Sequence, residues 1–494
     1  TSSPDPGAFG KPNIVFILVD DLDSSLVDPR YMPNLKRLMT DQGATFSNYF
    51  VDVSLCCPSR SSILRGQYAH NSGVYSNVAP SGGFQLFHAR GLEDSTVATW
   101  LQAAGYRTAL FGKYLNGYPD TVDDTYVPPG WDDWASPAKG DPYAEFGYTL
   151  NENGKLVDYG NDDSDYLTDV LSKKATSFID AKASSEQPFF MYLATYAPHQ
   201  PSVPAPRHRD QLGDVIAPRP PSFNESDVSA KPTWVKDRPL LDGQEIKNLD
   251  ELYRERARSM LAVDEMIGTL VDRLKATGKL DNTYLVFSSD NGFHMGEHRL
   301  RAGKYTPYEE DIHVPLVIRG PKVPAGEVIS QLTMNIDLAP TFGAIAGADV
   351  PSFVDGRSLL PLLGEATYGG AWRTAVLYEQ GSKDIEDELN LGVQGSATAN
   401  PGGVQEPRDP HERQQAAGPG ALRTPDLRAI RTDRYIFVQY ESGEREFYDL
   451  QADPYELNNI AKTADPGLLQ GLSARLERMS TCAGSACADA ENAE

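Results

Sequence analysis

Long apolar runs, cysteine and basic residues are all scarce in this sequence of 494 residues. No segment approaches the roughly 18 consecutive apolar residues of a membrane-spanning helix, so the sequence predicts no membrane insertion. The 45 basic residues are outnumbered by 69 acidic ones, which gives a formal net charge of −24. Long-range attraction of nucleic acid or anionic lipid is therefore excluded, and any anionic substrate needs a local basic pocket.

The four cysteines form two close pairs, Cys56 with Cys57 and Cys482 with Cys487. The second pair could close a small disulfide loop in an oxidising compartment, because the sequence offers no nearby ligands for a zinc site. The first residues, TSSPDPGAFGKP, are typical of a processed export product, although the boundary of an expressed fragment would look the same. We therefore expect a secreted, periplasmic or other extracytoplasmic location.

Short apolar segments alternate with helical patterns through most of the chain. The apolar segments end abruptly in polar residues, as buried parallel strands do, and span residues 13–19, 107–112, 188–196, 283–289 and 314–320. Helical patterns lie between them, at residues 32–43, 95–105, 166–181 and 249–278. This alternation predicts an α/β fold with a large, mostly parallel sheet flanked by helices.

Two stretches break this rhythm, residues 201–239 and 381–419, and their richness in Pro with Asp or Gly favours loops or insertions. After the second, residues 427–461 alternate between apolar and polar around a Ser-Gly turn, and a helical pattern follows at 466–480. We therefore predict a main domain over 1–380, a loop over 381–419, and a smaller C-terminal α+β subdomain with an antiparallel sheet over 420–494.

Polar residues follow four of the predicted strands at their carboxyl ends. They are Asp20 and Asp21, then Lys113, then His199, then Asp290 and Asn291. Ligands bind at that edge of an open α/β sheet, so we expect these side chains to meet in one crevice. Helix capping would explain one such residue more readily than four strand ends. The oxygen donors are those that Ca²⁺ or Mg²⁺ prefers, although one of the two adjacent aspartates could be a solvated turn residue.

The segment LCCPSRSSILRGQYAHN, residues 55–71, combines a reactive residue type with a helix start. Pro58 suits the first turn of a helix, so Cys56 is predicted to lie just before a helix N-terminus. The free N–H groups and positive dipole end there would hold an anion and lower the pKa of the thiol. The alternative is that Cys56 and Cys57 are structural thiols.

The pattern C-x-P-S-R at Cys56 to Arg60, followed by Leu64-Arg65-Gly66, resembles the signature of the type I sulfatases of the alkaline-phosphatase-like superfamily. Further stretches resemble the same family and cover nearly the whole chain: IVFILVDD, GKYLNGY, APHQP, SSDNGFHMGEH and FYDLQADPYELNNIA. CCPSR, GKYLN and DNG-x-H resemble more closely the N-acetylglucosamine-6-sulfatase branch. The main domain, residues 1–380, would then be the catalytic sulfatase domain.

The resemblance implies that a maturation enzyme oxidises Cys56 to formylglycine, whose hydrate attacks sulfur and then expels sulfate. Ca²⁺, rather than Mg²⁺, would be held by five residues: Asp20, Asp21, Asp290, Asn291 and the modified Cys56. Arg60 would hold the hydrate, while Lys113, His199 and Lys304 would surround the sulfate. We expect His199 to protonate the leaving alcohol, because imidazole titrates near neutral pH. For each basic residue taken singly, the alternative is an ordinary surface charge.

One position departs from the pattern of many arylsulfatases, which carry GK-x-H where this chain has Leu115. That histidine is assigned in the family as the base that collapses the sulfated intermediate. Asn116, His70 and His294 are the candidates that could replace it here. Asn116, His294 and His298 are also predicted substrate contacts, and the two histidines could equally be ordinary polar loop residues.

The sequence therefore predicts a sulfuric ester hydrolase acting on a sulfated saccharide, of the N-acetylglucosamine 6-sulfate type, or on an aryl sulfate. One rival is a phosphodiesterase or phosphonate monoester hydrolase of the same superfamily, which could use the same nucleophile and metal. Another is a catalytically silent sulfoglycan-binding protein with an unmodified Cys56.

Overall fold

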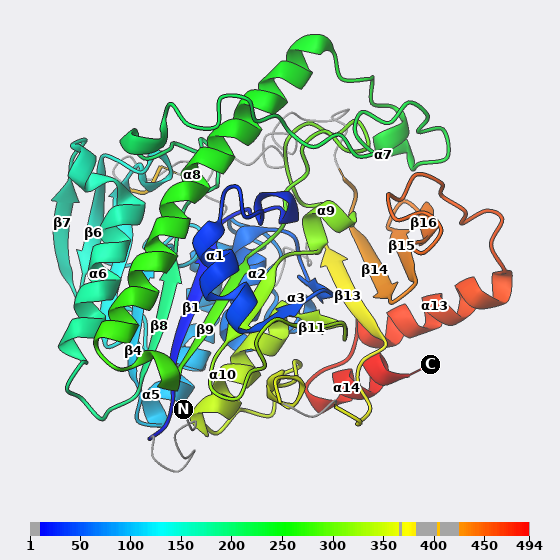
Figure 1. Ribbon diagram of the computed structural model, residues 1–494. Coiled ribbons are helices and arrows are strands. Elements are labelled where there is room, and N and C mark those ends of the chain that lie inside the picture. The colour runs from blue at the N-terminus through cyan, green and yellow to red at the C-terminus, as the bar shows by residue number, and fades with distance from the viewer. Residues whose placement is uncertain (1–9, 365–367, 382–402, 406–423, 494) are drawn as a thin grey trace.

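A ten-stranded sheet forms the centre of the computed structural model, which describes residues 10–364, 368–381, 403–405 and 424–493 (Figure 1). The strand order is β11-β2-β10-β9-β1-β8-β4-β5-β6-β7. The five strands from β9 to β5 in this order are parallel. The strand bounds are β1 Asn13–Val19, β2 Ala44–Phe46, β4 Arg107–Gly112, β5 Asp133–Gly140, β6 Tyr148–Glu152, β7 Lys155–Tyr159, β8 Phe189–Ala194, β9 Thr283–Ser289, β10 Leu316–Arg319 and β11 Glu327–Ile329.

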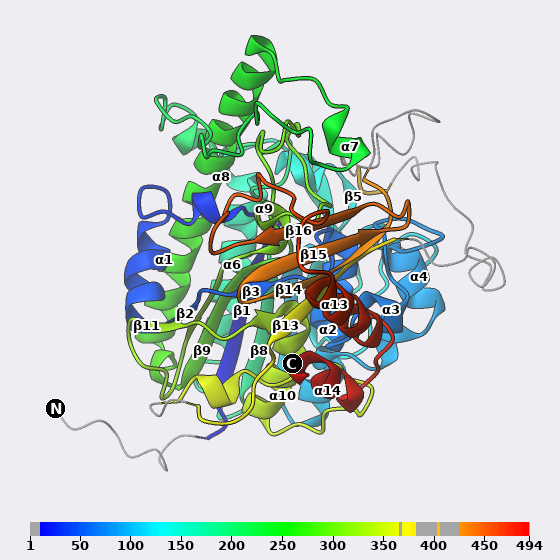
Figure 2. The same cartoon turned by 90° about the vertical axis from the view of Figure 1, so that its right-hand side faces the viewer.

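Helices cover both faces of this sheet, which explains why its central strands are apolar throughout. In β1, Phe16 packs into one core and Ile17 into the other, and all seven residues are buried. One face carries α1 Pro33–Leu38, α6 Leu167–Ala181 and α8 Gly243–Ala276, and the other carries α2 Cys56–Arg65, α5 Val97–Ala103 and α10 Leu338–Ala346 (Figure 2). The remaining short helices of this part are α3 Ala69–Ser72, α4 Gly83–Ala89, α7 Thr233–Lys236 and α9 Glu309–Ile312.

The predicted α/β fold is confirmed, but one of its strands runs the other way. Residues 314–320 were expected to form a parallel strand, whereas β10 is antiparallel to both β9 and β2. A parallel partner needs a long crossover connection, usually a helix. The segment between β9 and β10 instead contains only the four-residue helix α9, so the chain doubles back beside β9.

A second, four-stranded antiparallel sheet lies in the C-terminal part, as predicted. It consists of β13 Ala375–Gln380, β14 Leu427–Thr432, β15 Tyr435–Tyr440 and β16 Arg445–Asp449, and the helices α13 Pro466–Met479 and α14 Ser485–Asn492 accompany it. The predicted Ser-Gly turn joins β15 to β16. A small sheet also pairs β3 Tyr49–Phe50 with β12 Thr333–Met334. The first strand, β13, precedes residue 381, and the division at that residue stays a prediction.

The two predicted loops differ in how far the structure describes them. Residues 201–239 contain one short 3-10 turn and α7. Of residues 381–419, only 381 and 403–405 belong to the described part, so the second loop otherwise lies outside it. Cys482 and Cys487 form a disulfide. Within the described ranges, every helix is too short or too polar to cross a membrane.

Candidate active site

The predicted acidic residues meet at the carboxyl edge of the central sheet. Asp20 and Asp21 directly follow β1, and Asp290 and Asn291 directly follow its neighbour β9. The backbone N–H of Asp21 donates to Asp290 Oδ1 at 3.0 Å, and the Asn291 side-chain amide donates to Asp21 Oδ1 at 2.8 Å. Asp21 adopts a left-handed conformation with φ of 65°, so the two adjacent aspartates turn into the same crevice.

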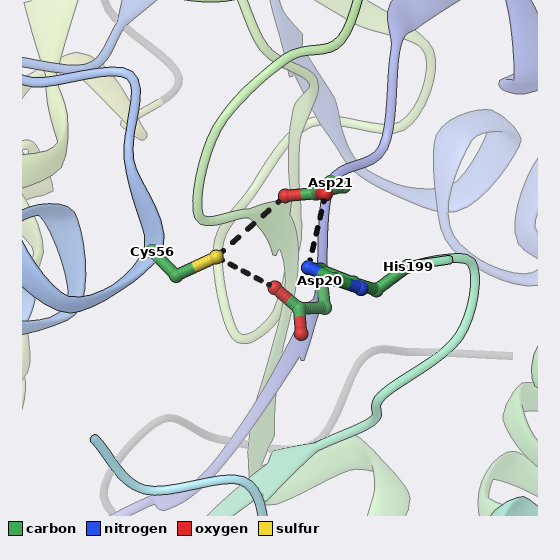
Figure 3. Close-up of side chains that lie close together, drawn as sticks. All are labelled: Asp20, Asp21, Cys56 and His199. Carbon is green, nitrogen blue, oxygen red and sulfur yellow. Dashed lines mark hydrogen bonds and ion pairs between the residues drawn. The ribbon is translucent and has the colours of Figure 1, made fainter. Parts of the chain in front are cut away.

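Cys56 enters this crevice from the other side, as the first residue of α2 (Figure 3). Its Sγ lies 3.2 Å from Asp20 Oδ1 and 3.6 Å from Asp21 Oδ1. The thiol was expected to have a lowered pKa at this helix start. Burial and the Asp20 carboxylate instead raise the pKa of Cys56 well above its usual value. The prediction of a lowered pKa was wrong because burial and the neighbouring negative charge both oppose ionisation of the thiol.

Three basic side chains surround the carboxylates, those of Arg60, Lys113 and Lys304. Arg60 lies one turn after Cys56 in α2, and its Nε donates to Asp290 Oδ2 at 2.8 Å. Lys113, directly after β4, places Nζ 2.6 Å from Asp20 Oδ2. Burial opposes ionisation of Asp20, but Lys113 and the other nearby cations hold its pKa at about 2. Asp20 is therefore an ionised carboxylate.

Lys304 and His199 complete the group. Lys304 Nζ lies 2.5 Å from Asp21 Oδ1 and 2.8 Å from Cys56 Sγ. His199 follows β8, and its Nε2 lies 3.5 Å from Asp21 Oδ2 (Figure 3). Its Nδ1 lies 2.7 Å from the carbonyl oxygen of Gln200, so Nδ1 carries a hydrogen and Nε2 faces the crevice. Sequence elements separated by more than 200 residues thus converge on one site.

Tyr143 belongs to this site, although no sequence motif pointed to it. Its ring centroid lies 4.7 Å from that of His199 and 5.1 Å from Lys113 Nζ. Tyr143 lies in a short turn between β5 and β6, and those antiparallel strands were not anticipated. Asn116, a predicted substrate contact, donates from its amide to the Tyr143 hydroxyl at 3.5 Å, so it lies beside Tyr143.

The predicted histidines lie in three different places. His294 lines a small cavity together with Lys304, Trp234 and Arg238, and its Nδ1 lies 3.0 Å from Asp311 Oδ1. His70 instead contacts Glu379 Oε1 at 2.7 Å and the Cys482 carbonyl oxygen at 2.9 Å.

His298 is fully buried, contacts Glu225 at 2.8 Å and stacks on Tyr308. Because these neighbours are not part of the Cys56 group, the structure does not bring His298 to the crevice. The predicted sugar contact at His298 therefore has no support from the geometry.

The donors at this edge fit the predicted divalent cation. One ligand atom from each of Asp20, Asp21, Cys56 and His199 lies within 4.8 Å of the others. Asn291 Oδ1 is fully buried and has no hydrogen-bond partner within the described part of the chain. A buried oxygen is rarely left in that state, and coordination of a hard cation would satisfy it.

Comparison with known proteins identifies the family. The Sulfatase family model matches residues 12–348, more than half of the chain. The chain belongs to the sulfatase family. Human N-acetylglucosamine-6-sulfatase is 37% identical to this sulfatase over 97% of this chain and 88% of the human one. The predicted family, and with it the assignment as an enzyme that hydrolyses sulfate esters, is confirmed.

Two solved structures resemble the sulfatase over nearly its full length. One, a complex with its substrate D-glucosamine-2-N,6-O-disulfate, has a TM-score of 0.74 at 26% identity and covers 95% of this chain and 97% of that one. The other is the phosphonate monoester hydrolase of Silicibacter pomeroyi, with a TM-score of 0.67 at 24% identity, covering 95% of this chain and 94% of that one. At that identity the second likeness concerns the fold alone.

Proposed function

We propose that this sulfatase hydrolyses the 6-O-sulfate ester of a glucosamine unit in a sulfated saccharide. The observation that carries the proposal is the placement of Cys56 Sγ between two aspartates and Lys304 Nζ, all in one crevice. The substrate class rests on the human relative's name and on the saccharide bound in the similar solved structure. Aryl sulfates are expected to serve as simple assay substrates.

In this proposal a maturation enzyme converts Cys56 to formylglycine, whose hydrate supplies the hydroxyl that attacks sulfur. A Ca²⁺ ion held by Asp20, Asp21, Asp290, Asn291 and the modified residue 56 supplies a Lewis acid beside the sulfate. Arg60 holds the modified side chain, because it packs in the same helix and is fixed by Asp290. Lys113 and Lys304 bind the sulfuryl oxygens and stabilise the charge that grows on them.

His199 is the proposed general acid. Its Nε2 faces the crevice while Nδ1 is held by the Gln200 carbonyl, so a proton on Nε2 can pass to the departing sugar oxygen as the S–O bond breaks. Tyr143 packs against the ring and fixes its orientation.

The base that Leu115 cannot supply is assigned here to His294. Its Nδ1 faces the Asp311 carboxylate, which holds the ring in one orientation, and it lines the same cavity as Lys304. Asn116 has an amide that takes no proton at neutral pH, and His70 is engaged by Glu379 and the Cys482 carbonyl. His294→Gln should give a burst of about one product alcohol per chain, then slow turnover. Steady turnover without a burst would remove His294 from this role.

Three measurements test the proposal as a whole. Peptide mass spectrometry should find Cys56 converted to the aldehyde in active protein, and Cys56→Ala should abolish turnover. Kinetics should favour 6-O-sulfated glucosamine over phosphate diesters and phosphonate monoesters. Dominant diester or phosphonate turnover would instead indicate a phosphodiesterase or phosphonate monoester hydrolase. If Cys56 is unmodified and the protein binds sulfated glycan without turnover, it is a binding protein and not a sulfatase.

Metal and location are proposed on separate grounds. Chelation should abolish activity, and Ca²⁺ should restore it better than Mg²⁺, because oxygen ligands in an irregular arrangement suit the larger ion.

The Cys482–Cys487 disulfide supports a secreted or periplasmic location. Thiol-trapping of the protein in its native host would test this location.

A further inference from the structure

A second group of metal-ligand side chains lies apart from the Cys56 crevice. One ligand atom from each of His298, Glu310 and Glu456 lies within 4.8 Å of the others. His298 follows β9 and Glu310 lies in α9, whereas Glu456 follows β16 of the C-terminal sheet. His298 is 0% exposed and Glu456 is 2% exposed. Glu310 is half-buried, and the group joins the main domain to the C-terminal part.

The hydrogen bonding of His298 leaves one ring nitrogen available. Its Nδ1 lies 2.8 Å from Glu225 Oε2 and 3.2 Å from Lys231 Nζ, and in the tautomer that donates to the nearer partner, the carboxylate, Nδ1 carries the hydrogen. The lone pair then lies on Nε2, which is buried and has no hydrogen-bond partner among the residues the structure describes. A carboxylate that fixes the far nitrogen of a histidine is the usual arrangement behind a metal-bound imidazole.

The carboxylate of Glu310 also has a buried atom, Oε2, that lacks a hydrogen-bond partner in the described part of the chain. Glu456 Oε2 accepts the backbone N–H of Glu309 at 3.0 Å, and a carboxylate has further lone pairs beyond the one used in this bond. Two buried acceptors without donors, close to a third carboxylate, are costly unless a cation or protons satisfy them.

The charges around this group also favour a bound cation. The ammonium group of Lys231 accompanies Glu225, Glu310 and Glu456, hydrogen-bonds the Glu456 carbonyl and lies 3.2 Å from His298 Nδ1. Lys231 is therefore on the Nδ1 side of the imidazole, away from Nε2. Without a bound cation, the group can lower its negative charge only by taking up protons.

We propose that His298, Glu310 and Glu456 form a second metal site, which takes a divalent transition-metal ion such as Zn²⁺. One imidazole nitrogen with two carboxylates suits Zn²⁺, whose ligands lie at about 2.0–2.2 Å, and leaves a fourth position for water. The oxygen-rich Cys56 crevice prefers Ca²⁺ instead. The ion ties α9 and the segment after β9 to the segment after β16, and Glu225 is the positioning residue for His298.

The experiment measures bound metal on metal-stripped full-length protein that is titrated with Zn²⁺ in excess Ca²⁺. Wild type and Asp20→Asn should each bind one Zn²⁺ per chain, while His298→Gln and Glu310→Gln should bind none. Glu225→Gln should weaken Zn²⁺ binding by about 10–100-fold. Glu309→Gln is the matched control, because that carboxylate pairs with Arg431 outside the site, and it should bind Zn²⁺ as wild type does.

Zinc-edge X-ray absorption of the wild-type protein provides a test that depends on no variant. It should show nitrogen and oxygen ligands at about 2.0–2.1 Å and no sulfur at about 2.3 Å. A sulfur ligand, or loss of Zn²⁺ in Asp20→Asn with retention in His298→Gln, would place the ion at Cys56 and overturn the proposal. Absence of Zn²⁺ binding in wild type would show a proton-sharing group instead. Sulfatase activity of the same wild-type protein is scored separately, so either hypothesis can fail alone.

Discussion

Lys304 Nζ lies 2.8 Å from Cys56 Sγ, although the two residues are 248 positions apart in the chain. Both side chains are buried, so this ammonium group lies beside the position that the hydroxyl of the formylglycine hydrate would take, in a setting where charge interactions are strong. The same Nζ contacts Asp21 Oδ1 at 2.5 Å, which orients Lys304 before substrate arrives.

Replacing Lys304 by Met should lower kcat by about 10²–10³-fold, the usual cost of removing one preorganised donor to a developing oxyanion. The exposed Lys247 in α8 provides the control, and Lys247→Met should leave kcat unchanged. Steady-state kinetics on an aryl sulfate measure both. Equal activity of the Lys304 variant and wild type would show that this ammonium group does not meet the sulfate.

His199→Gln should slow saccharide desulfation more than aryl sulfate hydrolysis. A sugar alkoxide needs a proton as it leaves, a contribution of about 10²–10⁴-fold, whereas a nitrophenolate leaves without one. The ratio of kcat/KM on the two substrates therefore changes with the variant. A uniform loss on both substrates would indicate that His199 binds the sulfate and does not act as the acid.

Arg373 should be essential for attaching the C-terminal helix α14 to the main domain. Its guanidinium pairs with Asp337 before α10 and with Glu491 in α14, and all three side chains are 0% exposed. Arg373→Leu leaves the buried Asp337 without its guanidinium partner and Glu491 with Arg357 alone, which should lower the free energy of unfolding by about 3–5 kcal/mol.

The control for Arg373 is the surface pair Arg434–Asp449, in which Arg434 is 52% exposed. Solvent screens such pairs, so Arg434→Leu should change the urea midpoint little. Equal shifts in the two variants would contradict the importance of burial at Arg373.

Asp52 should make the protein less stable as the pH rises toward neutrality. Burial raises its pKa from 3.8 to about 7, despite hydrogen bonds from Ser62 and Asn335. Between these values the folded chain retains a proton that the unfolded chain has released. Stability is therefore highest below the unfolded pKa and falls by up to about 1.4 kcal/mol per pH unit until the pH passes the folded pKa.

Urea unfolding of wild type and Asp52→Asn from pH 5 to 8 isolates this contribution. The stability difference should shift in favour of the Asn variant up to about pH 7 and then become constant, because Asn does not ionise. Parallel curves across the whole range would show that Asp52 is already ionised in the folded protein at pH 5.

Residues with strong local patterns were predicted well. The apolar run that forms β1 is buried on both faces, and the polar residues after β1, β4, β8 and β9 do meet at one edge. Parallel strands share a direction, so a residue type at each carboxyl end already implies a common site. The C-x-P-S-R pattern placed Cys56 at a helix start for the same local reason.

The sequence by itself therefore determined the α/β fold, the family and the groups of the candidate active site, because these depend on local periodicity and short motifs. Only the tertiary structure decided the direction of β10, the raised pKa of Cys56, the packing of Tyr143 on His199 and the burial of His298 beside Glu310 and Glu456. Each of these depends on distance, desolvation or a partner far away in the chain, and such quantities exist only once the chain has packed.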